Sequence, residues 1–429
     1  MLRVCILTET YHPVVGGGET QARLLADGLS AGDADVCVLT RRSDASFPSV
    51  ERMDRVRVHR VGSVGRGQLR KWSLLVSTVP ALVRLRHAYD LVLVSGFRIV
   101  GAPAVLVSRM LGKRVVLKAD SQGEMSGTFF AAGLSRFGMS ASSLPFRMFL
   151  RLRNAVLRRA DGFVAISPEI ASELEGARVP PERIHPIPNG VDTSRFVPAD
   201  SSVKEALRRE LGLESDGGVV VYTGRLVSYK GLPLLLKVWP AILREHPAAR
   251  LLLVGGGGLD MHNCEQELKD YARENRLEHS VVFTGNVPNV PDYLRAADVF
   301  AFPTENEAFG SSLVEAMCCG LAVVTTPVGA ISTIVQHGQN GLVIQPGAAG
   351  ELESALNRLL SDRALATRLG SAAHRCAVER YSAERVTRQY LDLFQNIVGR
   401  KHPGSSSNEM PSGVSGVDRI RRDAGGRAE

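Results

Sequence analysis

The chain has 429 residues, 44% hydrophobic and 22% charged, which is enough to bury the cores of two or three globular domains. Its apolar runs are shorter than the roughly 18 residues of a membrane-spanning helix, and its short apolar start is followed at once by an acid, unlike a signal peptide. Six scattered cysteines form no CxxC pair, which argues against a zinc knuckle or a redox motif. We expect a cytoplasmic protein.

The net charge of +8 is unevenly distributed along the chain. Residues 1–195 hold 27 Lys and Arg against 17 Asp and Glu, a balance of +10, whereas residues 196–379 hold 16 against 21, a balance of −5. Residues 380–429 hold 9 against 6, a balance of +3. This asymmetry indicates that the first part of the chain faces an anionic surface.

The first part of the chain alternates strands with helices. The strands are near-continuous runs of apolar and β-branched residues, which is typical of a parallel sheet covered on both faces. Helical periodicity follows the first strand at 20–32 and the last strand of this run at 168–176. The expected strands are residues 2–9, 34–42, 56–62, 89–96, 113–120 and 162–167, and residues 183–192 are expected to form a further strand and a turn.

The same pattern restarts after about residue 200. Strands are expected at residues 218–226, 249–258, 281–285, 299–304, 321–329 and 341–347, with helices between them. Two such units predict an α/β fold of two doubly wound, Rossmann-like domains with a cleft between them. We place these domains at residues 1–195 and 196–379, a last helix at 380–399, and a disordered Gly/Ser/Pro-rich tail at 400–429.

A glycine-rich turn, Gly16, Gly17 and Gly18, follows the first expected strand. Such a turn lets backbone N–H groups approach an anion or a sugar at the start of a helix. The spacing is not GxGxxG and no acid ends the second strand, which argues against a dinucleotide site. The turn is either a ligand-binding loop or a structural connection between strand and helix.

The segment TGRLVSYKG places Arg225 and Lys230 just after a strand of the second unit. Ligands of open α/β sheets bind at this end of the strands. An Arg fork together with a Lys point charge can hold a diphosphate without a metal ion. The alternative is that both are ordinary solvated surface charges.

The segment ENEAFGSSLVEAM, residues 305–317, carries two acids, Glu307 and Glu315, around an FGSS core. Three interpretations compete: a solvated helix face, a metal site, or a grip on a polar ligand. We expect Glu307 in a loop and Glu315 inside a helix capped by Ser311 or Ser312, so that the acids need not share a helix face. No His or third acid has ligand spacing here, which makes a metal site the weakest interpretation.

The stretch 125–160 contains no acid, and its second half, LPFRMFLRLRNAVLRR, is basic and amphipathic. Such a helix can bind anionic lipid headgroups through its Arg residues and the bilayer interface through Phe and Leu. The alternative is an ordinary surface helix with one buried face. Nucleic-acid binding is not expected, because no recognised fold or aromatic platform accompanies the charge. The arginines concerned are Arg136, Arg147, Arg151, Arg153, Arg158 and Arg159.

Taken together, these motifs resemble the retaining glycosyltransferases of family 4, which have the GT-B fold. The resemblance covers nearly the whole chain to about residue 398, and the acids of residues 305–317 match the E-x7-E signature of that family. It implies a sugar nucleotide bound mainly by the second domain, no cofactor and no metal, and a last helix that crosses back to the first domain. The motifs that carry it are GGGETQARLLADGL, ADGFVAISPEIASELEGARVPPERIHPIPNGVDTSRF, YTGRLVSYKG, VVFTGNV and ENEAFGSSLVEAM.

The resemblance also implies roles for individual residues. Arg225 and Lys230 hold the diphosphate, Glu307 contacts hydroxyls of the transferred sugar, and Glu315 binds the ribose hydroxyls. The glycines at 16–18 close over the phosphates from the first domain. Asn286 and Val287 line the base. The segment beside the sugar and phosphates contains Phe309, Gly310, Ser311 and Leu313.

The chain departs from the family pattern at one point. Many members have a His at a strand end of the first domain that faces the donor sugar, whereas this chain has no His between His87 and His185. Asp120 or a neighbour takes its place, or another residue holds the sugar. No residue can be singled out as a covalent nucleophile.

The leading hypothesis is therefore a hexosyltransferase that uses a UDP- or GDP-sugar and a glycan or lipid-linked acceptor, as a peripheral protein on the inner membrane face. A sugar-nucleotide epimerase of the same fold is the second hypothesis. A non-catalytic sugar-nucleotide sensor or membrane scaffold is the third, and the missing His is its only support.

Overall fold

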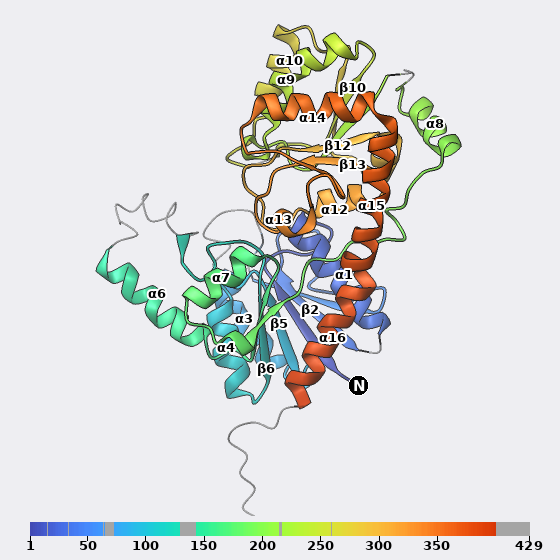
Figure 1. Ribbon diagram of the computed structural model, residues 1–429. Helices are drawn as coiled ribbons and strands as arrows, with labels where there is room; N and C mark the ends of the chain where they lie inside the picture. Colours follow the sequence, from blue (N-terminus) through green and yellow to red (C-terminus); the bar gives the residue numbers. More distant parts are fainter. Residues whose placement is uncertain are drawn as a thin grey trace, which may run out of the picture.

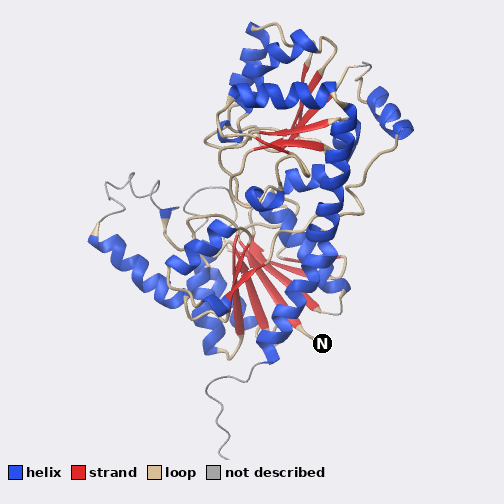
Figure 2. Ribbon diagram, in the orientation of Figure 1, coloured by secondary structure: helices blue, strands red, loops and turns tan. Residues whose placement is uncertain are grey.

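The computed structural model describes residues 1–14, 16–32, 34–62, 64, 73–128, 143–213, 217–258 and 260–399. They form two α/β domains, one above the other, with the last helices running along one side of both (Figures 1 and 2). The tail expected at 400–429 and the residues 129–142 of the basic stretch lie outside the described residues.

The first domain contains an eight-stranded sheet in the order β3-β4-β2-β1-β5-β6-β7-β8. All neighbouring strands pair in parallel except β3 and β4. The edge strand β3 was not predicted, because its sequence VERM lacks an apolar run. The strands are β1 (Arg3–Thr8), β2 (Asp35–Arg41), β3 (Val50–Met53), β4 (Val56–Val61), β5 (Leu91–Ser95), β6 (Arg114–Ala119), β7 (Gly162–Ala165) and β8 (Ile184–Pro186).

Helices cover both faces of this sheet, because successive side chains of a strand point to opposite faces. Cys5 and Leu7 of β1 lie in one core with α3, α4 and α7, whereas Val4 and Ile6 lie in a second core with α1 and α16. The helices of this domain are α1 (Gly17–Ala31), α3 (Ser73–Arg84), α4 (Gly101–Met110), α6 (Leu144–Leu157) and α7 (Pro168–Gly176).

The second domain contains a six-stranded sheet in the order β11-β10-β9-β12-β13-β14, with all pairs parallel. Apolar runs such as VVVYT and VFAF are buried along their whole length, as expected for a sheet covered on both faces. The strands are β9 (Val219–Thr223), β10 (Arg250–Val254), β11 (Val281–Gly285), β12 (Val299–Phe302), β13 (Ala322–Thr325) and β14 (Leu342–Val343).

Short and long helices surround the second sheet. A short 3-10 helix, η3 (Ser228–Lys230), follows β9 directly. The α-helices are α8 (Ser201–Glu210), α9 (Leu232–Glu245), α10 (Glu265–Glu274), α11 (Val290–Ala296), α12 (Ser311–Cys318), α13 (Ile331–Ile334), α14 (Ala349–Ser361) and α15 (Arg363–Tyr381).

The chain passes between the domains twice, and the two passages are hydrogen-bonded to each other. Val191 donates its N–H to the Tyr381 carbonyl over 2.8 Å, and Ala383 donates to the Val191 carbonyl over 2.8 Å. After Tyr381, α16 (Ala383–Gly399) crosses back and packs on α1 of the first domain (Figure 1). Two doubly wound domains with a helix that crosses back confirm the predicted fold class.

None of the described helices combines the length and the apolar character that are needed to cross a membrane.

Candidate active site

The loop between β12 and α12 separates the two acids of residues 305–317. Glu307 lies in this loop, whereas Glu315 lies about one turn inside α12 (Ser311–Cys318). Gly310 has φ of 93°, a left-handed conformation that favours glycine, and it immediately precedes the helix without a side-chain cap. The expected Ser311 or Ser312 cap was wrong, because both residues already lie inside α12. The first N–H groups of α12 are therefore not occupied by a capping side chain.

Lys230 and Glu307 form an ion pair between the ends of two neighbouring strands, β9 and β12. Lys230 Nζ lies 2.7 Å from Glu307 Oε2, and the two side chains are only 11% and 17% exposed. Glu307 Oε1 accepts hydrogen bonds from the N–H groups of Ala308 (3.0 Å) and Phe309 (3.3 Å). The carboxylate is thus fixed by one cation and by its own loop, and both charges lie at the carboxyl end of the sheet.

Gly231 explains how Lys230 comes so close to the loop. It has φ of 72°, and a Cβ at this position would lie 1.9 Å from the Pro303 carbonyl oxygen. Only a glycine lets η3 pack directly against the backbone that follows β12.

Arg225 lies in the turn after β9 and is paired on both sides. Its Nη1 forms an ion pair with Asp260 in the turn after β10, and its Nη2 donates to the Tyr229 hydroxyl over 2.9 Å. The Arg225 side chain is nonetheless 60% exposed, so its guanidinium remains accessible to a ligand. Sequence reasoning missed Asp260 and Tyr229, because neither has a motif of its own and the pairing depends on which turns meet.

Glu315 is half-buried in α12, and burial raises the pKa of its carboxyl group to about 7, an effect that the positive charge of Arg195 partly opposes. Arg195, from the connection between the domains, also donates to the Pro288 carbonyl over 2.8 Å. Arg195 therefore acts on the Glu315 carboxylate through its charge and is hydrogen-bonded to the turn that follows Asn286 and Val287. Arg195 was not predicted as a site residue, although it lies near the end of the motif IPNGVDTSRF, because the motif does not show that Arg195 comes near Glu315.

Phe309 and Leu313 have side chains that belong to the core. Phe309 is 3% exposed and its ring meets Tyr381 edge-on at 5.8 Å, and Leu313 is fully buried. Any contact of these two residues with a ligand must therefore come from their backbone. Gly310 and Ser311 lie between them at the start of α12.

The glycine turn of the first domain stands at the N-terminal end of α1. A Cβ added at Gly17 or Gly18 would meet no other atom within 4 Å, so the backbone faces open space there. Gly16 is different, because a Cβ there would lie 2.4 Å from the Glu19 carboxylate, which is bonded to the Thr10 hydroxyl. The preceding Val15 lies outside the described residues.

Asp120 lies just after β6, at the carboxyl end of the first sheet. It forms an ion pair with Lys118, accepts a 2.7 Å hydrogen bond from the Ser95 hydroxyl, and donates its N–H to Glu124 Oε1 over 3.0 Å. Glu124 is 1% exposed; burial and the nearby Asp120 charge raise its pKa to about 7, opposed by Arg98. All these hydrogen bonds stay within the first domain.

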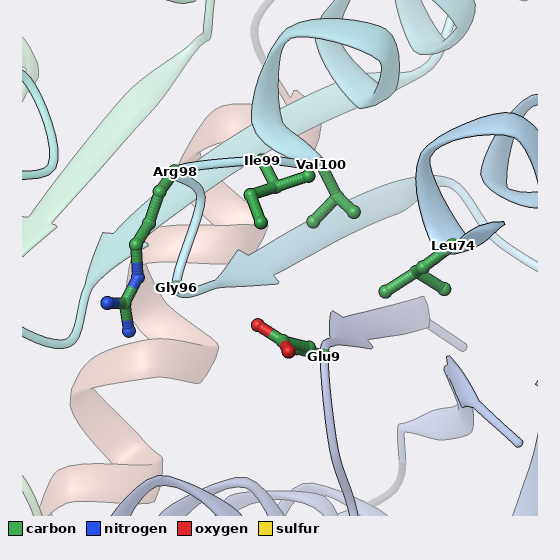
Figure 3. A pocket seen from close by; sticks show the side chains of 6 residues that line it. All are labelled: Glu9, Leu74, Gly96, Arg98, Ile99 and Val100. Atoms are coloured by element: carbon green, nitrogen blue, oxygen red, sulfur yellow. The ribbon is translucent and has the colours of Figure 1, made fainter. Parts of the chain in front are cut away.

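A pocket lies at the same edge of the sheet (Figure 3), and one of its lining residues, Gly96, is a neighbour of Asp120. Gly96 connects the two, since a Cβ at Gly96 would lie 3.3 Å from Asp120 Oδ2. The carboxylate of Glu9 points toward Gly96, and the side chain of Arg98 runs along the other side of Gly96 (Figure 3). The pocket is lined by Glu9, Leu74, Gly96, Arg98, Ile99 and Val100.

The described residues contain no group of three His, Cys, Asp or Glu side chains arranged to hold a metal ion. The charged groups that the structure does gather are cations paired with carboxylates at the ends of parallel strands. This arrangement is suited to binding anionic and hydroxylated ligands.

Known proteins share both halves of this architecture. The model of glycosyltransferase family 4 matches residues 15–195, and that of glycosyl transferases group 1 matches residues 203–375. The D-inositol 3-phosphate glycosyltransferase of Salinispora arenicola is 30% identical over 415 residues, which is 91% of this chain and 89% of that protein. The D-inositol 3-phosphate glycosyltransferase of Xylanimonas cellulosilytica is 32% identical over 254 residues, or 57% of this chain; the match spans 59% of that relative's length.

The solved structure of Anabaena Alr3699/HepE in complex with UDP and glucose has the same fold, with a TM-score of 0.73 at 22% identity over 92% of this chain and 100% of that chain. Two facing doubly wound domains of this kind define the GT-B class of glycosyltransferases. Within that class, the chain belongs to the family 4, or group 1, glycosyltransferases. The resemblance seen in the sequence motifs is thereby confirmed.

Proposed function

We propose that the protein is a retaining hexosyltransferase that moves a hexose from a UDP- or GDP-sugar to a glycan or lipid-linked acceptor at the inner face of the membrane. The observation that carries this proposal is the Lys230–Glu307 pair beside the uncapped start of α12. It brings the cation of η3 together with a carboxylate and backbone N–H groups of the β12–α12 loop. A diphosphate needs the cation and the N–H groups, and sugar hydroxyls need the carboxylate.

The other predicted residues extend this arrangement over the length of a sugar nucleotide. In the proposal Arg225 and Lys230 bind the diphosphate, and they stabilise the departing charge together with the dipole of α12, without a metal ion. Glu315 binds the ribose hydroxyls beside Arg195, and the turn of Asn286 and Val287 lines the base. The UDP and glucose named for the Anabaena structure make UDP-glucose the first donor to test.

Asp120 and the glycine turn of the first domain complete the proposed site from the other side. Asp120 lies at a strand end, with its carboxylate oriented by Ser95 and Lys118, which suits hydrogen bonding to a sugar hydroxyl. The backbone at Gly17 and Gly18 is open to an approaching phosphate.

The experiment that tests the proposal is a donor panel of UDP- and GDP-hexoses, with nucleoside diphosphate release and the anomeric configuration of any product as readouts. We expect turnover of one donor with retention, and loss of turnover in Glu307→Ala. If no donor is turned over and Glu307→Ala binds donors as well as the wild type, the proposal is wrong. A new sugar nucleotide formed without acceptor would identify an epimerase instead, and binding without turnover would identify a sensor.

The outer face of α6 supports the proposed contact with an anionic membrane. Leu144, Met148 and Leu152 are 73%, 58% and 67% exposed, and the exposed Arg147 and Arg151 lie on the same helix. Exposed apolar side chains flanked by cations are typical of helices that lie in a bilayer interface. The neighbouring helices add further exposed apolar side chains, which are Val76, Val79 and Val83 of α3 and Leu106 and Met110 of α4.

Arg153 and Phe146 do not belong to this face, although the sequence interpretation placed them with it. Both are 7% exposed and point into the domain. The correction follows from helix geometry: residues are about 100° apart around the axis, so Arg147 and Arg151 lie near each other while Arg153 lies on the far side.

Vesicle sedimentation tests the membrane contact with the exposed arginines only. We expect Arg147→Ala/Arg151→Ala to bind vesicles of phosphatidylglycerol and phosphatidylcholine about 30-fold more weakly, at about 1 kcal/mol for each arginine. Arg209→Ala/Arg273→Ala removes the same charge from exposed sites of the second domain and should bind like the wild type. Vesicle binding that does not weaken with added salt would contradict the electrostatic account, and so would an equal loss of vesicle affinity in both variants.

A further inference from the structure

Arg153 joins α6 to two loops at the carboxyl edge of the first sheet. Its Nε and Nη2 donate to the Arg98 carbonyl over 3.2 and 3.0 Å, and Nη2 also donates to the Glu124 carbonyl over 2.8 Å. Its neighbour Asn154 donates to the Met125 carbonyl over 2.9 Å. One helix thus binds the loop after β5 and the loop after β6 at the same time.

Both of these loops belong to the first-domain side of the proposed site. The loop after β5 supplies Gly96 and Arg98 to the pocket of Figure 3. The loop after β6 begins with Asp120, whose N–H is bound by the Glu124 carboxylate. Arg153 therefore reaches the pocket through the Arg98 backbone, and it reaches Asp120 through Glu124.

The loop after β6 is also held from α7. Glu173 accepts hydrogen bonds from the N–H groups of Gly123 (2.7 Å), Met125 (2.9 Å) and Ser126 (2.8 Å). These bonds fix the far end of the loop to α7.

Arg153 joins the loop after β6 to the loop after β5, together with the Ser95–Asp120 hydrogen bond and the Glu124 carboxylate, which is bonded to the backbone of both Phe97 and Asp120. Arg153 thus bonds both loops, whereas the three hydrogen bonds of Glu173 go only to the loop after β6.

Burial of a charged guanidinium costs free energy because the charge loses its hydration. For Arg153 this loss lowers the pKa of the guanidinium to about 10. A leucine at this helix position would fill the space without that cost, but it would leave the Arg98 and Glu124 carbonyls without these donors. The planar fork of Arg can bind two carbonyls from different loops at once, which the single ammonium of Lys does less well.

We propose that Arg153 is a positioning residue, which holds the loops after β5 and β6 in the arrangement that presents Asp120 and the pocket of Figure 3 to the acceptor side of the reaction. This inference rests on the proposed function for its effect on turnover. It assigns Arg153 no contact with substrate.

The test compares Arg153→Lys and Arg153→Met with Arg183→Lys. Arg183 is a matched control, because it also donates to two carbonyls of the first domain, those of Arg158 and Ala160, both at 3.3 Å, but away from the two loops. The readouts are kcat and donor KM with UDP-glucose, UDP affinity by calorimetry, and hydrogen–deuterium exchange of residues 96–100 and 120–128. Thermal denaturation confirms that each variant is folded at the assay temperature.

We expect kcat to fall about 10-fold in Arg153→Lys and further in Arg153→Met, at unchanged UDP affinity, because hydrogen bonds from a charged donor are lost only on the first domain. Exchange of residues 96–100 and 120–128 should rise in both variants and stay at the wild-type rate in Arg183→Lys. Unchanged kcat and exchange in Arg153→Met would overturn the proposal. A fall of UDP affinity as large as the fall of kcat would also overturn it, because it would indicate a general loss of stability.

The exchange readout also separates this proposal from the proposed function. If the wild type turns over no sugar nucleotide, the proposed function fails, and the exchange comparison still decides the role of Arg153. Loop opening confined to the Arg153 variants then supports the positioning role, and equal exchange in all variants overturns it.

Discussion

The two domains share a doubly wound architecture but build their halves of the proposed site in different ways. In the second domain, Arg225, Lys230 and Glu307 directly follow neighbouring strands, and each charge is paired with another residue of the same edge. In the first domain, Asp120 depends on a buried acid, and its loop is held by two helices. The proposed donor side is thus encoded in short motifs, whereas the proposed acceptor side depends on contacts between distant segments.

The two domains also differ in net charge. Residues 196–379 have a balance of −5 and residues 1–195 a balance of +10, yet both candidate sites hold a buried or half-buried cation–carboxylate pair, Lys230 with Glu307 and Lys118 with Asp120. The net charge of a domain therefore does not set the charge pattern of its candidate site. The predictions below test whether the donor side and the acceptor side can be separated in this way.

The largest effect is expected for Lys230→Ala. Removal of this cation leaves Glu307 unpaired and removes a charge that the departing diphosphate needs, so kcat should fall about 10²–10³-fold. Steady-state kinetics with UDP-glucose measures the loss, and Lys237→Ala, an exposed lysine of α9, serves as the control. A fall of less than about 10-fold would remove Lys230 from the centre of the proposed donor site.

A smaller effect that is confined to turnover is expected for Asp120→Asn. The substitution keeps the shape but removes the negative charge that Lys118 and Ser95 orient, so kcat should fall about 10- to 150-fold. UDP affinity, measured by calorimetry, should not change, because the proposed UDP-binding residues lie on the other domain. Asp54→Asn on the surface is the control, and a loss of UDP affinity in Asp120→Asn would break the separation between the two sides.

The pH dependence of donor binding should report Glu315. Its carboxyl group has a pKa raised to about 7 and must lose its proton to accept hydrogen bonds from both ribose hydroxyls. Donor affinity should therefore rise about 10-fold between pH 6 and pH 8, since about one-tenth of the group is ionised one unit below its pKa. Calorimetric titrations at several pH values should show this rise in the wild type and a flat profile in Glu315→Gln.

The raised pKa of Glu315 should make the folded state less stable as the pH rises, although donor binding should become tighter. Because the pKa of Glu315 is higher in the folded chain than its ordinary value of 4.5, the folded state binds the proton more tightly. The contribution to stability is present below that ordinary value and is lost as the pH rises through about 7. A wild type that gains stability relative to Glu315→Gln over this range would contradict the assignment.

The smallest expected effects are the stability changes caused by alanine at Gly310 and at Gly17, which should differ between the two glycine-containing loops. Gly310→Ala forces a residue with a Cβ into φ of 93°, which should lower the free energy of unfolding by about 1–2 kcal/mol. Gly17→Ala, at a helical position with open space around it, should change stability by less than about 1 kcal/mol. Urea denaturation measures both. Equal losses would show that the glycine turn of the first domain is as constrained as that of the second.

The amino-acid sequence by itself determined the two α/β units and supplied the candidate site residues of the second domain. Apolar runs of strand length define where each strand ends, and functional residues of a parallel sheet follow those ends, so Arg225, Lys230, Glu307 and Glu315 became candidates from local patterns. The same patterns placed Glu307 in a loop and Glu315 in a helix, as the structure shows.

The tertiary structure alone decided which groups are paired and which are buried. Asp260 beside Arg225, Arg195 beside Glu315 and the inward side of Arg153 have no local signal, because burial depends on which helix face packs against segments 35 to 120 residues away. The physical reason is that a side chain's charge state and partners are set by its neighbours in space, and only chain folding brings these neighbours together.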